Sequence, residues 1–269
     1  MIAYKKHLEL IGYQTSTIQS LLYVAKEYLD YTAQKPCLMT DYLNYLASRK
    51  NKNNPTKTLS KAQLNMHIYG LKKYFMYLER VENKIITDSF LSYKITQKPI
   101  LYLTLEEVKQ LFEATKYNPR WQERDQAILA CLYHLGLRVG EACNLKLEDI
   151  NLETNIILIK TSKTGFARQL PIPANAKVIF KNYLEINEIQ PNDYFLQGIK
   201  KQLNKQVIGR ILRNLKAKTT IKKRIYAHLL RHSIATQLLK NGMEIEKISQ
   251  FLGHRSLEST QKYTHILET

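Results

Sequence analysis

The segment AHLLRHSIATQLL, residues 227–239, decides the fold class and raises the question of function. Its apolar residues recur at helical spacing, which predicts a helix packed against a core. Core helices rarely bury charge without a partner. His228, Arg231 and His232 therefore need a chemical reason, and His228 and Arg231, three residues apart, share one face of the helix. A metal site and a phosphate clamp are the two explanations.

The length and composition of the chain are those of a globular protein. Its 269 residues suffice for two compact domains, and 44% hydrophobic with 24% charged residues argues against disorder. We find no run of about 18 apolar residues and expect no membrane-spanning helix. The first residues, MIAYKKHLELIGYQT, lack the apolar core and cleavage site of a signal peptide, so we expect a cytoplasmic protein.

The net charge of +18 is the strongest global signal. Such an excess attracts polyanions and speeds their capture. The positive residues are spread along the chain, which favours DNA bound by folded elements over a localisation signal. The three widely spaced cysteines form neither a disulfide framework nor a metal pattern, and Cys131 in its apolar run is expected to be a buried thiol.

Residues 1–92 are predicted to form a helical domain. Apolar stripes predict helices over residues 16–32, 39–50 and 60–81. The polar segment RKNKNNPTKTLS, residues 49–60, is expected to be a loop that can touch phosphates. Residues 93–103 carry no helical stripe and include Pro99, which indicates a linker.

Residues 104–269 are predicted to form a second, mixed domain. Thr104 and Glu107 make a capping box that begins a helix over residues 104–115, and Gly136 is expected to end an apolar helix over 124–136. Two strands joined by the turn TSKTGF are predicted over 154–160 and 167–173. Further helices are expected over 174–186, 205–218, 227–242 and 244–253. The predicted fold class is mainly α with a small β-hairpin or sheet.

A metal site fits residues 228–232 poorly. HLLRH lacks the glutamate of a zinc-protease helix, and an arginine between two ligands would repel the cation, so His232 is interpreted as structural. Phosphate chemistry fits better. Two arginines can fork onto one phosphodiester, a histidine can shuttle a proton, a lysine can protonate a leaving alkoxide, and a tyrosine hydroxyl can attack phosphorus. Such a site needs no metal and no cofactor.

Residue types for this chemistry stand in four segments of the second domain. The segments are GLRVGEACNL, TSKTGFARQLPI, HLLRH and LGHRSLESTQKYTH. In this order they resemble the tyrosine recombinase (phage integrase) family, including its Xer-like site-specific recombinases, over nearly the whole chain. The resemblance implies an N-terminal helical, SAM-like core-binding domain that clamps DNA over residues 1–92 and a catalytic domain over 104–269.

The resemblance also implies a role for each matched residue. Tyr263 would be the nucleophile that forms a 3′-phosphotyrosyl link. Arg138 and Arg231 would hold the phosphate. His228 would assist proton transfer at the nucleophile, and His254 would hydrogen-bond the phosphate.

Two lysines compete for the role of general acid. Lys163 stands in SKTG ahead of the LPI strand, where the family carries its hairpin lysine, and Lys160 lies three residues earlier. Position relative to LPI favours Lys163. Glu141, three residues after Arg138, stands at the family's accompanying acidic position.

The family implies double-stranded DNA with paired recombination sites as partner, self-association to a tetramer in the synapse, and a Holliday-junction intermediate. It implies no ATP, metal or membrane, and a location at the nucleoid. Xer-like resolution and integration or excision of a mobile element both stay open. The alternatives are a type IB topoisomerase that relaxes DNA, and a catalytically silent DNA-binding architectural protein.

Overall fold

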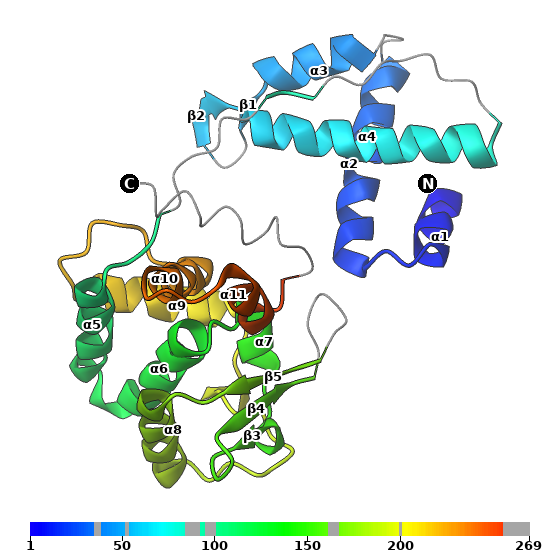
Figure 1. Ribbon diagram of the computed structural model, residues 1–269. Helices are drawn as coiled ribbons and strands as arrows, with labels where there is room; N and C mark the ends of the chain where they lie inside the picture. Colours follow the sequence, from blue (N-terminus) through cyan, green and yellow to red (C-terminus); the bar gives the residue numbers. More distant parts are fainter. Residues whose placement is uncertain are drawn as a thin grey trace. The chain divides into compact units, whose positions relative to one another are not determined.

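The computed structural model describes residues 1–34, 39–51, 54–83, 92–94, 101–160, 167–198 and 201–254. The chain forms two compact units, Met1–Lys98 and Pro99–Thr269, each with its own apolar core. In the described ranges helices dominate both units and are accompanied only by short antiparallel strands (Figure 1). The predicted fold class is confirmed.

The first unit is built from helices around a tyrosine-rich core. The helices are α1 (Ile2–Leu10), α2 (Thr15–Gln34), α3 (Met39–Ser48) and α4 (Lys61–Val81). The three predicted helices are confirmed, and α1 is an addition that Tyr4 and Leu8 anchor in the core. α4 packs closely on α2 because Gly70 has no side chain, since a Cβ there would lie 2.8 Å from Val24.

The polar segment at residues 49–60 differs from the predicted loop. β1 (Lys50–Asn51) pairs antiparallel with β2 (Asn54–Thr58), and Lys50 lies opposite Thr58. Backbone groups make this pairing, so a polar composition does not reveal it. Ser60 then begins α4 in a capping box with Gln63.

In the second unit the helices pack around a buried central segment, and a small sheet lies to one side of them (Figure 1). The helices are α5 (Leu105–Ala114), α6 (Gln122–Leu129), α7 (Val139–Asn144), α8 (Ala174–Ile186), α9 (Lys205–Lys216), α10 (Ala227–Lys240) and α11 (Ile245–Leu252). The predicted capping box is present, with the Thr104 backbone N–H donating to Glu107 at 2.8 Å and the Glu107 N–H donating to Thr104 Oγ1 at 3.1 Å. The six helices expected in this unit are present, with bounds that differ by a few residues, and the one expected over 124–136 consists of α6 and the π-helical turn that follows it.

The sheet has the order β3-β4-β5 and is antiparallel. Its strands are β3 (Ile150–Asn151), β4 (Ile156–Ile159) and β5 (Arg168–Pro171). Ile157 pairs with Leu170, and both are buried, so this face of the sheet packs on the core. A further short pair, β6 (Gln197–Gly198) and β7 (Lys201–Gln202), was not predicted. The turn predicted at residues 161–166 lies outside the described residues.

Gly136 ends the central apolar segment, as predicted. α6 continues as a π-helical turn, η3 (Ala130–His134), and Gly136 then takes the left-handed conformation with φ 57°. A Cβ at Gly136 would lie 3.0 Å from Leu252 and 3.1 Å from Phe251. The glycine therefore lets the end of α11 approach the chain just before Arg138.

Two of the cysteines are buried thiols of the second core. Cys131 and Cys143 are free, and burial raises the pKa of both thiols. The prediction for Cys131 is confirmed. Cys37 lies outside the described residues.

Candidate active site

Arg231 is buried at 1% exposure on α10, which packs on η3 and α11. It donates from Nη1 to the carbonyl of Gly136 and from Nη2 to the carbonyl of Leu252. The last carbonyls of a helix lack intrahelical partners and carry partial negative charge. The carbonyls of Gly136 and of the end of α11 thus accept hydrogen bonds from a cation that lies inside an apolar helix.

Arg138 lies just before α7 and is tied to Glu141. Its backbone N–H donates to Glu141 Oε2 at 2.9 Å, and its Nη1 donates to Oε1 at 2.8 Å. The carboxylate is 2% exposed, whereas the Arg138 side chain is 25% exposed. The backbone and one nitrogen of the Arg138 guanidinium are therefore fixed to a buried carboxylate, while part of the side chain stays accessible to solvent.

A second arginine completes this cluster. Arg168, the first residue of β5, donates to both oxygens of Glu141 at 2.9 Å. Burial alone would raise the pKa of Glu141, but the hydrogen bonds and charge of Arg168, with the bonds from Arg138, outweigh burial and hold this pKa below its ordinary value. Glu141 is therefore an anion shared by two guanidinium groups.

Three arginines from three elements meet the end of α11. Arg168 Nε donates to the carbonyl of Phe251 at 3.3 Å, Arg231 Nη2 donates to that of Leu252, and Arg138 Nη2 donates to that of Gly253 at 2.7 Å. The three acceptors are consecutive, and His254 follows them directly. Packing thus brings Arg138, Arg231 and His254, which the sequence predicts as site residues, to one place.

His228 and His232 lie on α10 before and after Arg231, and His254 follows the end of α11. The rings of His228 and His232, one turn apart on α10, have centroids 4.2 Å apart in an edge-to-face arrangement. His228 is exposed and His254 is half-buried. The backbone N–H of His254 donates to the carbonyl of Ser249 at 3.0 Å, which fixes its backbone to the last turn of α11.

The ammonium of Lys160 is engaged by two carboxylates. Its Nζ lies 2.8 Å from Glu148 Oε1 and 2.7 Å from Asp149 Oδ1, and these bonds raise the pKa of Lys160. Lys160 is therefore ion-paired with both carboxylates. Lys163 and Tyr263 lie outside the described residues, and their roles stay predictions.

Arg168 is the residue that the sequence reasoning missed. It stands in ARQLPI, between the predicted hairpin turn and the apolar strand residues. The available signal in the sequence was an arginine on a predicted strand beside apolar residues. The burial of its side chain, which is 11% exposed, and that of the Glu141 carboxylate are seen only in the structure.

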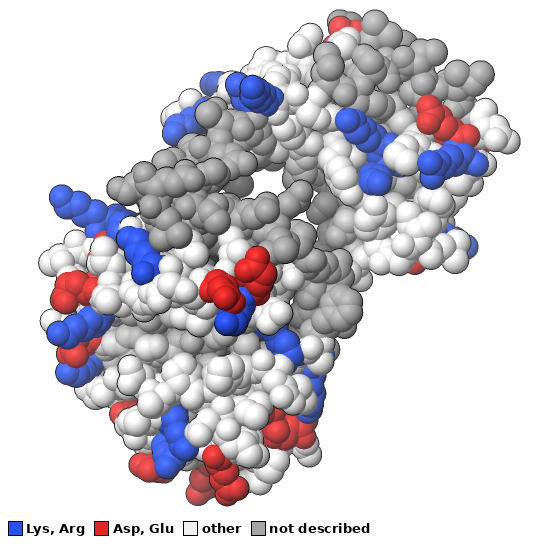
Figure 2. Space-filling view, in the orientation of Figure 1, with Lys and Arg blue, Asp and Glu red and all other residues white. Residues whose placement is uncertain are grey.

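A concave basic cluster lies next to α9. It consists of Arg213, Lys216, Lys222 and Arg224, which line a hollow of about 370 Å³ together with Ile225. None of the described residues lining it is acidic. Elsewhere, on the face shown in Figure 2, Lys and Arg side chains are spread over both units with Asp and Glu among them. The α9 basic cluster is therefore a local excess of positive charge.

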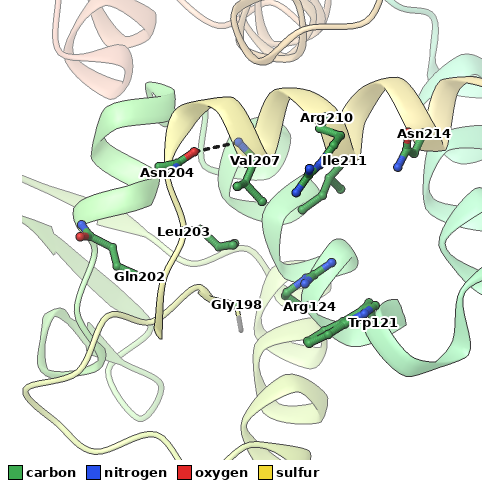
Figure 3. Close-up of a pocket in the computed structure, with 10 residues that line it drawn as sticks. All are labelled: Trp121, Arg124, Gly198, Gln202, Leu203, Asn204, Val207, Arg210, Ile211 and Asn214. Atoms are coloured by element: carbon green, nitrogen blue, oxygen red, sulfur yellow. Dashed lines mark hydrogen bonds between the residues drawn. The ribbon is translucent and has the colours of Figure 1, made fainter. Parts of the chain in front are cut away.

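A separate hollow of about 460 Å³ lies between the start of α6 and α9. Trp121 and Arg124 face Arg210, Ile211 and Asn214 across it (Figure 3). The guanidinium carbon of Arg124 lies 4.1 Å from the centre of a Trp121 ring. This hollow shares no residue with the arginine cluster at α11.

Neither a metal centre nor a membrane span is found in the described part of the chain. Among the residues that the structure describes, no group of three or more His, Cys, Asp or Glu is placed to hold a metal ion. Within those residues, no helix has the length and apolar character needed to cross a membrane.

Comparison with known proteins identifies relatives over nearly the whole chain. Residues 102–269 match the sequence model of the phage integrase family. The tyrosine recombinase XerA of Pyrococcus furiosus is 34% identical over 269 residues, which cover 97% of this chain and 87% of the relative.

Solved structures show the same fold. The site-specific recombinase XerH, bound to palindromic difH substrate after cleavage, superposes with a TM-score of 0.76 at 22% identity, covering 93% of this chain and 76% of that one. A lambda integrase tetramer bound to a Holliday junction gives a TM-score of 0.68 at 18% identity, covering 94% and 76%.

Proposed function

Since the chain belongs to the phage integrase family and is a tyrosine recombinase that cleaves and rejoins DNA in site-specific recombination, we propose that Tyr263 is its nucleophile. The convergence of Arg138, Arg231 and the end of α11 beside His254 is the observation that carries this proposal. It supplies two guanidinium groups with fixed planes at one point, which is what a single phosphodiester requires.

The proposed reaction uses the side chains of Tyr263, His228 and Lys163 at a phosphate held by the two arginines. The Tyr263 hydroxyl attacks phosphorus and loses its proton with the assistance of His228, and the bond to the 5′-oxygen breaks. Lys163 donates a proton to that oxygen, which leaves a 3′-phosphotyrosyl ester and a 5′-hydroxyl. Attack by the 5′-hydroxyl of a partner strand reverses the step and reseals the DNA. The ester conserves the energy of the bond.

The two arginines suit the phosphate role by their anchoring. The bonds to two carbonyls fix the plane of the Arg231 guanidinium. The Arg138 side chain is 25% exposed, so its accessible edge can meet a phosphate. Both cations are oriented before DNA binds, so little reorganisation opposes the transition state.

We propose that the partner is double-stranded DNA with paired recombination sites. The protein binds this DNA as a tetramer in the synapse, and strand exchange proceeds through a Holliday junction. Support comes from the net charge of +18, the α9 basic cluster, and the likeness to recombinases solved on DNA and on a Holliday junction. Each cation that neutralises a phosphate releases counterions. Because the substrate is then chromosomal or mobile-element DNA, we expect the protein at the nucleoid in the cytoplasm.

A nicked suicide substrate tests the nucleophile. Wild-type protein should form a covalent DNA adduct, and Tyr263→Phe should form none while it still binds DNA. Tyr226→Phe is a matched control, since Tyr226 is an exposed tyrosine at the start of α10 and should keep wild-type cleavage. An adduct in Tyr263→Phe would show that another tyrosine is the nucleophile.

The same preparation separates the alternatives. Relaxation of a plasmid that has no defined recombination site would favour a type IB topoisomerase activity. Absence of any covalent adduct in the wild-type protein would favour a silent DNA-binding protein.

A further inference from the structure

Arg168 occupies a special place in the second unit. As the first residue of β5 it pairs with Ile159, the last residue of β4. It therefore closes the ladder next to the segment that carries Lys163. Although it begins a short strand next to the predicted turn, its side chain is only 11% exposed.

Its guanidinium is directed at protein groups. Nη1 and Nη2 fork onto the two oxygens of Glu141, and Nε donates to the carbonyl of Phe251. Each nitrogen of the group thus bonds an acceptor within the chain. Arg168 is placed to orient its neighbours, whereas the more accessible Arg138 is placed to meet substrate.

Glu141 connects Arg168 to Arg138. A carboxylate offers about four lone-pair positions, and Glu141 receives two bonds from Arg168 and two from Arg138. If Arg168 were lost, the buried carboxylate would attract the Arg138 guanidinium more strongly. Arg138 would then turn toward Glu141 and away from the carbonyl of Gly253.

Arg168 also packs against the residue before His254. Gly253 is in the left-handed conformation, with φ 64° and ψ 51°. A Cβ on Gly253 would lie 2.8 Å from Nη1 and 2.9 Å from Cζ of Arg168. The guanidinium therefore lies against the backbone at the end of α11, and this contact fixes the position of the backbone that leads into His254.

We propose that Arg168 is a positioning residue that sets Arg138 through Glu141 and sets His254 through the end of α11. The inference rests on the proposed function of that site. Arg168 pairs with Ile159 at the end of the β4–β5 ladder, and the segment that carries Lys163 lies between these two residues in the chain. The Arg168 side chain therefore connects the strand that follows this segment to both Arg138 and His254.

The test uses Arg168→Lys, which keeps the charge and loses the fork. Single-turnover cleavage of the suicide substrate is measured at saturating protein and well below the melting temperature. We expect a rate loss on the order of 100-fold, since small displacements of catalytic groups have effects of that size. DNA affinity should stay near that of the wild type, because the Arg168 guanidinium is bonded within the chain and its side chain is only 11% exposed.

Arg124→Lys is the matched control for stability. The Arg124 side chain is 12% exposed and bonds the buried carboxylate of Asp125, so its burial and ion pair resemble those of Arg168. It should lower the melting temperature and leave cleavage unchanged. A wild-type cleavage rate in Arg168→Lys, or an equal loss in both variants, would overturn the proposal.

A charge-compensated pair tests the route through Glu141. Arg168→Met should be slow, and adding Glu141→Gln should make it faster, because removal of the carboxylate releases Arg138. If Arg168→Met is slow only because packing is lost, the double variant should cleave as slowly as Arg168→Met or more slowly. That result would also refute the proposal. If Arg168→Met does not fold, the comparison of Arg168→Lys with Arg124→Lys decides. A wild-type protein without any adduct would instead refute the proposed function.

Discussion

Replacing Gly253 by alanine tests how tightly the end of α11 is held against Arg168. The added Cβ would come within 2.8 Å of the Arg168 guanidinium. That group cannot move freely, because it is forked onto the buried carboxylate of Glu141. The methyl group must therefore displace either the ion pair or the end of the helix.

Gly242→Ala isolates the effect of the contact. Gly242 has φ 82° and no heavy atom within 4 Å of its added Cβ. Both variants carry left-handed strain of about 1–2 kcal/mol. Loss of one partner of a buried ion pair costs roughly 3–5 kcal/mol, so partial displacement should destabilise Gly253→Ala by about 1–3 kcal/mol more than Gly242→Ala. A unit of this size loses about 2–4 °C per kcal/mol, which gives a difference of roughly 2–12 °C.

Thermal unfolding followed by circular dichroism measures this difference, and suicide-substrate cleavage measures its effect on the site. Gly253→Ala should also cleave slowly, whereas Gly242→Ala should cleave like the wild type. Equal melting temperatures of the two variants would show that Arg168 is not held at Gly253, and the reasoning would fail.

Three further results are expected. Lys163→Ala should slow cleavage of an ordinary phosphodiester and recover on a 5′-bridging phosphorothiolate, because a thiolate leaves without a proton; rescue of Lys160→Ala instead would transfer the acid role. Alanines at the α9 basic cluster should lower the slope of log affinity against log salt by about 0.9 for each phosphate that the protein no longer neutralises, and an unchanged slope would remove the cluster from the DNA interface. Burial lowers the pKa of His67, although the negative charge of Glu27 opposes this shift. As the pH falls, the unfolded chain therefore takes up a proton on His67 at a higher pH than the folded chain does. Below about pH 6.5 the stability of the first unit should therefore fall with pH by at most about 1.4 kcal/mol per unit, until the folded-state pKa is passed. Urea unfolding of His67→Gln should show a flatter pH dependence, and an equal dependence would contradict this origin.

The sequence by itself determined most of the helices and the candidate residues. Apolar periodicity is local, so the stripes of α2, α4 and α10 predict helices before any packing is known. The same holds for the capping box at Thr104 and for Gly136, whose positive φ is a property of one residue. The order of the four motifs named the family, which the relatives confirm.

Only the tertiary structure decided which groups meet. Arg138 reaches a carbonyl 115 residues away, and Arg231 reaches one 95 residues away. No local pattern encodes such contacts, because a guanidinium is satisfied by whichever acceptor the packing of distant elements supplies. Arg168 was missed for this reason, since its fork depends on β5 lying beside α7 and α11. The ion pairs of Lys160 likewise depend on tertiary structure, because two carboxylates engage its ammonium only when residues 148–149 fold next to β4.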